Sequence, residues 1–120
     1  MRASFRPWVL VAGVNGLVAV AFAAYATHGI ADGHAQALAE RAWQFQLLHA
    51  LALLTADRLA GEGRRAAGIA AALFTLGIVL FSGSLYWKAL VGPPPVPLIT
   101  PAGGIAFMLG WLALATASRV

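Results

Sequence analysis

Apolar residues run in four long stretches along this chain, and each stretch ends at Arg, Pro or Gly. A helix of about 20 apolar residues matches the hydrocarbon core of a bilayer, which is about 30 Å thick. The pattern therefore predicts transmembrane helices at roughly residues 7–27, 42–58, 66–90 and 101–118. The expected fold is an all-α integral membrane protein, an antiparallel bundle of four transmembrane helices that forms one domain over residues 1–120.

Local signals indicate where these helices begin and end. Asp32 is suited to cap a second helix that starts near Gly33 and extends beyond the membrane before residue 42. Residues 92–97 read Gly-Pro-Pro-Pro-Val-Pro, which cannot be helical and predicts a stiff extended loop. Thr100 followed by Pro101 is typical of a helix start, with Thr as the cap and Pro in the first turn.

Composition strengthens the membrane assignment, and charge orients the bundle. The chain is 61% hydrophobic and only 10% charged, whereas soluble domains carry about 25% charged residues. Four spans place six basic residues on one side (Arg2, Arg6, Arg58, Arg64, Arg65 and Arg119) and two on the other (Arg41 and Lys88). By the positive-inside rule both termini are expected in the cytoplasm.

The N-terminal run has the outline of a secretory signal peptide, with Arg2 and Arg6 before apolar residues and a small-residue site at Ala24-Tyr25-Ala26. The run is long for a signal core, so we expect it to be retained as the first span. The chain contains no Cys, which excludes disulfides, Cys-ligated zinc and thiol catalysis. No nucleic-acid partner is expected, because the charge of +4 is explained by residues beside the spans.

Three polar side chains are predicted near the middle of the membrane. Asn15 lies halfway along the first span, His49 halfway along the second, and Gln46 one turn before His49 on the same helix face. Polar groups inside a membrane are functional candidates by default. They can also simply hydrogen-bond to one another and hold helices together. The trio is therefore either a polar midplane site or a set of structural hydrogen bonds between helices.

A second candidate lies near the non-cytoplasmic surface, where His28, Asp32 and His34 could form a surface site. The polarity of helix ends explains these residues equally well. A haem between His28 and His49 is not expected, since the two lie about 15 Å apart in depth. Ser82 and Ser84 have no His and acid at their depth, so their hydroxyls are expected to bond to carbonyls of their own helix. No cofactor, resident metal or catalytic residue is predicted.

Four motifs resemble those of the domain-of-unknown-function 423 family, which is similar to the mammalian transmembrane protein 256. They are AAYATHGI at residues 23–30, FQLLHALALL at 45–54, LFSGSLY at 80–86, and TPAGG at 100–104 followed by Gly-Trp at 110–111. Together they touch all four predicted spans. The resemblance implies a small multi-pass protein of the bacterial inner (plasma) membrane and carries no established activity with it.

The leading functional hypothesis is a non-enzymatic protein that works by association, as an accessory subunit of a larger membrane complex or as a self-associating bundle. It follows from the lack of a soluble domain or catalytic set, together with many small residues in the spans. One alternative is a small transporter or channel that uses Asn15, Gln46 and His49. Another is lipid or quinone binding between helices. Membrane lipids are expected partners in every case.

Overall fold

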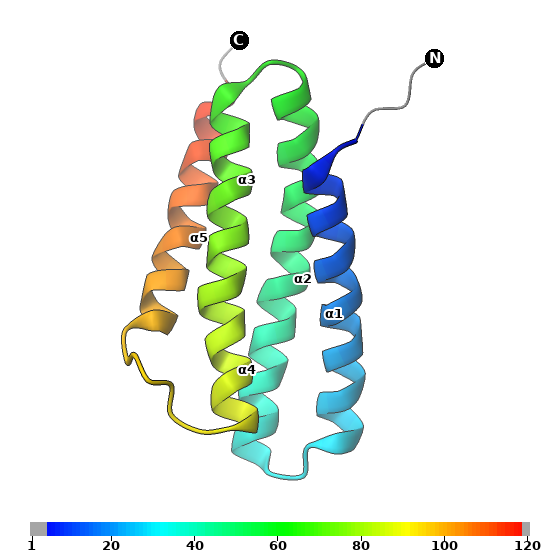
Figure 1. The fold of residues 1–120 in the computed structure, drawn as a ribbon, viewed down its shortest axis with the longest axis vertical. Helices are drawn as coiled ribbons and strands as arrows, with labels where there is room; N and C mark the ends of the chain where they lie inside the picture. Colours follow the sequence, from blue (N-terminus) through cyan, green and yellow to red (C-terminus); the bar gives the residue numbers. More distant parts are fainter. Residues whose placement is uncertain (1–4, 119–120) are drawn as a thin grey trace.

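The structure, a computed structural model, describes residues 5–118, and these residues form helices and connecting loops with no strand. The elements are α1 (Pro7–Gly29), α2 (Gly33–Gly61), α3 (Arg65–Gly77), the π-helical segment η1 (Ile78–Ser82), α4 (Gly83–Leu90) and α5 (Ile99–Thr116). Because α3, η1 and α4 follow one another without a break, they make one long helix. Successive helices run in opposite directions, so the start of α1 and the end of α5 lie at the same end of the molecule (Figure 1).

Of these three local predictions, the start of α2 and the absence of helix in the proline-rich stretch are confirmed. The α2 helix starts at Gly33, and the Asp32 carboxylate accepts a hydrogen bond of 2.8 Å from the Ala35 N–H. Residues 91–98, which include the proline-rich stretch, are not helical. The predicted Thr cap of the last helix is wrong. The α5 helix starts one residue earlier, at Ile99, and its N-cap Leu98 makes no side-chain bond. The Thr100 hydroxyl lies against the Ser84 hydroxyl of α4 instead, which satisfies both groups.

The helices pack in an order that leaves α1 and α5 at opposite edges (Figure 1). The α1 helix packs along α2, the continuous α3–η1–α4 helix packs along another side of α2, and α5 packs along α3 and η1. Leu53, Phe74 and Phe107, from three different helices, lie at the centre of the core. Many other buried side chains are alanines, which let helix backbones approach closely.

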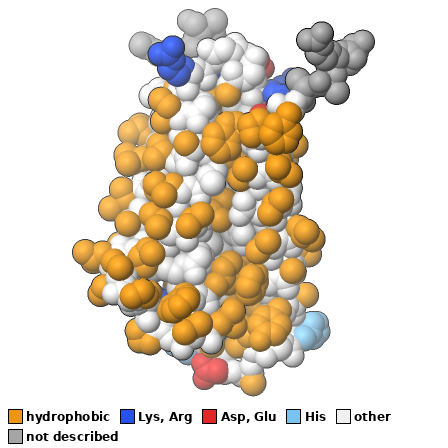
Figure 2. Space-filling model, in the orientation of Figure 1, with side chains coloured by type: hydrophobic (Ala, Val, Ile, Leu, Met, Phe, Trp, Pro, Cys, Tyr) orange, Lys and Arg blue, Asp and Glu red, His pale blue; other side chains and the backbone are white. Residues whose placement is uncertain are grey.

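The outer surface is apolar along the length of the molecule. Large side chains such as Leu17, Val79 and Leu112 are exposed, and on the face drawn in Figure 2 hydrophobic side chains cover the middle while charged ones gather toward the ends. Among the described residues, three helices are long and apolar enough to cross a membrane: α1, the continuous helix Arg65–Leu90, and α5. The α2 helix, which contains the span expected at residues 42–58, is not among them because polar and charged residues interrupt it.

Candidate functional site

A chain of hydrogen bonds joins three helices in the interior. The Tyr86 hydroxyl of α4 donates to Gln46 Oε1 of α2 at 2.6 Å. Gln46 Nε2 donates to Asn15 Oδ1 of α1 at 2.9 Å, and Asn15 Nδ2 donates to the Val11 carbonyl at 2.8 Å. Each amide group therefore donates and accepts at once, and the chain ends on a backbone carbonyl. Gln46 is buried, so its two bonds replace those that water would supply.

His49 lies in a separate cluster that faces α5. Its side chain is 2% exposed, and its ring stacks on Phe107 with the ring centres 3.7 Å apart. Trp111 Nε1 is 3.0 Å from His49 Nε2, and His49 Nδ1 is 2.7 Å from the Phe45 carbonyl. An indole N–H can only donate, so Nε2 must be the acceptor. The proton then lies on Nδ1 and is donated to the carbonyl, which makes His49 neutral with both ring nitrogens engaged.

The structure thus brings only part of the predicted trio together. Asn15 and Gln46 are hydrogen-bonded, as their similar depth suggested, while His49 bonds to a different helix. Their direct partners Tyr86 and Trp111 were not identified from the sequence. Both partners are aromatic residues with a polar tip, but spacing along one helix does not show which neighbouring helix such a residue faces.

The expectation for Ser82 is also wrong. Its hydroxyl is fully buried and donates to the Ala42 carbonyl of α2 at 2.8 Å, across the helix interface instead of within its own helix. Ser84 does bond to its own helix, at the Phe81 carbonyl. The indole N–H of Trp43 is buried without a hydrogen-bond acceptor among the described residues. Most interior polar groups described here therefore act as contacts between helices.

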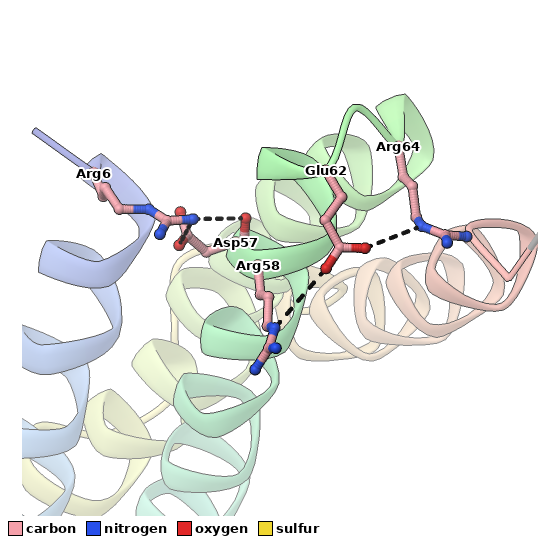
Figure 3. A network of polar contacts seen from close by, with 5 residues as sticks. All are labelled: Arg6, Asp57, Arg58, Glu62 and Arg64. Atoms are coloured by element: carbon pink, nitrogen blue, oxygen red, sulfur yellow. Dashed lines mark hydrogen bonds and ion pairs between the residues drawn. The ribbon is translucent and has the colours of Figure 1, made fainter. Parts of the chain in front are cut away.

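Charged side chains tie the helices together at the end where α2 turns into α3 (Figure 3). Arg6, just before α1, lies 2.8 Å from the carboxylate of Asp57, which is buried near the end of α2. Glu62 in the turn lies 3.9 Å from Arg58 and 3.6 Å from Arg64. Arg64 also donates to the Ala117 carbonyl at 2.6 Å, just beyond α5. These contacts connect the ends of all four helices.

Two open clefts, of about 360 and 550 Å³, lie at this same end. The smaller is lined by residues 62–66 and the end of α5, the larger by residues 5–8 and the end of α2. Neither cleft includes Asn15, Gln46 or His49, so the interior polar groups do not line an opening at either place.

The residues of the candidate surface site lie where α1 ends and α2 begins. His28, Asp32 and His34 are all exposed, and the Asp32 carboxylate caps α2. Within residues 5–118, no three His, Asp or Glu side chains lie close enough together to hold a metal ion. The position of Asp32 is explained by helix capping.

An apolar exterior, three helices long enough to cross a bilayer, and polar side chains bonded to one another inside define an all-helical membrane protein. The chain belongs to the family described as "Protein of unknown function (DUF423)", whose sequence model matches residues 21–104. This finding confirms the resemblance seen in the motifs.

Bacterial relatives match over nearly the whole chain. A UPF0382 membrane protein of Staphylococcus epidermidis is 34% identical, over 94% of this chain and 95% of the relative. The UPF0382 membrane protein YwdK of Bacillus subtilis is also 34% identical, over 94% and 96%. A UPF0382 membrane protein of Haemophilus influenzae is 31% identical, over 92% of each chain. No solved structure matches the chain significantly.

Proposed function

We propose that this chain is a non-enzymatic, multi-pass protein of the bacterial inner membrane that acts by associating with another membrane protein or with a second copy. All four helices span the bilayer in this proposal, including α2, whose 29 residues give a helix about 43 Å long. The relatives, which are named membrane proteins and come from bacteria, support the location.

One observation carries the proposal: the interior polar side chains that a transport pathway or reaction centre would need are engaged with one another. Gln46 uses both ends of its amide, and His49 uses both ring nitrogens. A pathway for a proton or solute needs polar groups that can exchange partners with the moving species. These bonds favour a structural role and weigh against the transporter alternative.

Charge supports an orientation with both termini in the cytoplasm. Among the described residues, Arg6, Arg58, Arg64 and Arg65 lie at the end where α1 begins and α2 turns into α3, whereas Arg41 and Lys88 lie toward the other end. Arg2 and Arg119, which contributed to the sequence argument, lie outside the described residues. The excess of basic residues marks the cytoplasmic side.

Purification in a mild detergent tests the proposal. The protein is expressed in its native membrane with an affinity tag, and the eluate is examined by native mass spectrometry and by protein identification. We expect either a stoichiometric membrane-protein partner or an oligomer of the chain itself. A strictly monomeric protein with no stoichiometric partner would show that association is not its function.

A further inference from the structure

One face of α2 is left uncovered by the other helices along its whole length. Seven exposed residues lie on it at alternating spacings of four and three: Ala37, Arg41, Gln44, Leu48, Leu51, Thr55 and Arg58. This spacing keeps them in a stripe about 100° wide, which we call the free α2 stripe. The same spacing is the one by which two parallel helices pack against each other over several turns.

The free α2 stripe is not a surface suited to lipid. The side chains of Arg41, Gln44 and Thr55 are exposed and have no hydrogen-bond or ion-pair partner in the part of the chain that the structure describes. Arg41 and Arg58 are 17 residues apart, or about 26 Å along the helix, so Gln44 and Thr55 lie between them at bilayer depth. Hydrocarbon cannot satisfy these polar groups, whereas another helix can.

Other exposed helix faces differ in this respect. The outer face of α1 presents Val14, Leu17 and Val20, and that of α5 presents Met108, Leu109 and Leu112. These side chains are all apolar, and lipid acyl chains cover them at no cost in hydrogen bonds. The need for a protein partner is therefore concentrated on α2.

We propose that the free α2 stripe is the contact between two copies of this chain, in a parallel dimer. This inference rests on the association proposed above and names the partner and the surface. Two copies inserted with the same orientation are related by a two-fold axis normal to the membrane, so their α2 helices run side by side in the same direction. Residues of the stripe then face their own counterparts.

Charge and hydrogen bonding fit this arrangement. Gln44 meets Gln44 of the second copy, and an amide can donate and accept at the same time. In parallel packing of this spacing, Arg41 lies beside the second copy's residue 40, which is Glu40, whereas Arg58 already lies 3.9 Å from Glu62 of its own chain. Arg41 thus gains an acidic neighbour, while Leu48 and Leu51 form the apolar centre.

Cysteine cross-linking tests the contact, because the native chain contains no Cys. Leu48→Cys and Leu51→Cys are compared in native membranes with the control Leu17→Cys, whose side chain is exposed on α1. Because Asn15 bonds to Gln46, Leu17 lies at about the depth of Gln44. Under mild oxidation we expect disulfide-linked dimers from both α2 variants and monomers from the α1 control. Cross-linking of the control to an equal extent, or none at α2, would overturn the proposal.

A second variant tests the chemistry of the contact. Gln44→Leu should raise the dimer dissociation constant in detergent by about 5- to 30-fold, the range expected for loss of an interhelical hydrogen bond, while Leu17→Ala should leave it unchanged. Unaltered dimerisation of Gln44→Leu would refute the role of Gln44. If native mass spectrometry finds an oligomer or partner but the α2 variants do not cross-link, this interface is wrong and the association stands. A monomer without a partner refutes both.

Discussion

His49 shows how a single polar residue is accommodated inside this apolar bundle. A buried imidazole needs a donor for one nitrogen and an acceptor for the other, and Trp111 and the Phe45 carbonyl supply them. Stacking on Phe107 fills the remaining space with apolar contact. These contacts predict that His49 contributes to stability.

Replacing this side chain tests that role. His49→Ala should lower the free energy of unfolding by about 2–4 kcal/mol, because it leaves a cavity beside Phe107 and removes the acceptor of the Trp111 N–H. The nearby exposed residue Leu112 provides a control, and Leu112→Ala should change stability by only about 0.5 kcal/mol. The measurement is denaturant unfolding in mixed micelles. Equal effects of the two substitutions would contradict a structural role for His49.

At the level of helices, the π-helical segment η1 lies where the continuous α3–η1–α4 helix contacts both α2 and α5. Within it the Gly83 N–H bonds to the Ile78 carbonyl, five residues back, so the helix is locally wider than an α-helix. Ser82 ends this segment and bonds across to α2. The α5 helix comes so close here that a Cβ on Gly103 would overlap backbone atoms of Leu80 and Phe81.

This close approach yields a prediction with a matched control. Gly103→Ala should destabilise the protein by about 1–3 kcal/mol, since backbone atoms cannot move aside as a flexible side chain can. A Cβ on Gly13 of α1 would meet no atom within 4 Å. Gly13→Ala should therefore leave stability within about 1 kcal/mol, in the stabilising direction expected for alanine in a helix. Thermal unfolding in detergent compares the two, and a harmless Gly103→Ala would show that α5 does not pack this closely.

At the level of the whole molecule, ionic and hydrogen-bonded contacts between helix ends are concentrated at one end. Arg6 connects the start of α1 to Asp57 (Figure 3), and Arg64 connects the α2–α3 turn to Ala117, the residue after α5. The opposite end is held by the Asp32 cap and by Gln36, which donates to the Ala26 carbonyl at 2.8 Å. The arginines that make these contacts also belong to the excess of basic residues from which the orientation of the bundle is proposed.

Accessibility of single cysteines tests the orientation. Ala31→Cys lies in the α1–α2 connection and Arg65→Cys at the start of α3, and both positions are exposed at opposite ends of the molecule. In spheroplasts, a membrane-impermeant maleimide should label Ala31→Cys at once and Arg65→Cys only after the membrane is broken. The reverse pattern would place the termini outside.

The sequence alone was sufficient to predict helical structure, the start of α2, the non-helical proline-rich loop and the family, because these depend on local apolar runs, caps and motifs. It also placed Asn15 and Gln46 at one depth, since depth follows from counting residues along a helix. Only the tertiary structure showed that His49 turns toward Trp111, that Tyr86 completes the chain of amides, and that Ser82 bonds across to α2. The physical reason is that the partner of a side chain depends on how neighbouring helices are rotated and how closely they approach, which the packing of small residues and the π-helical segment decide together.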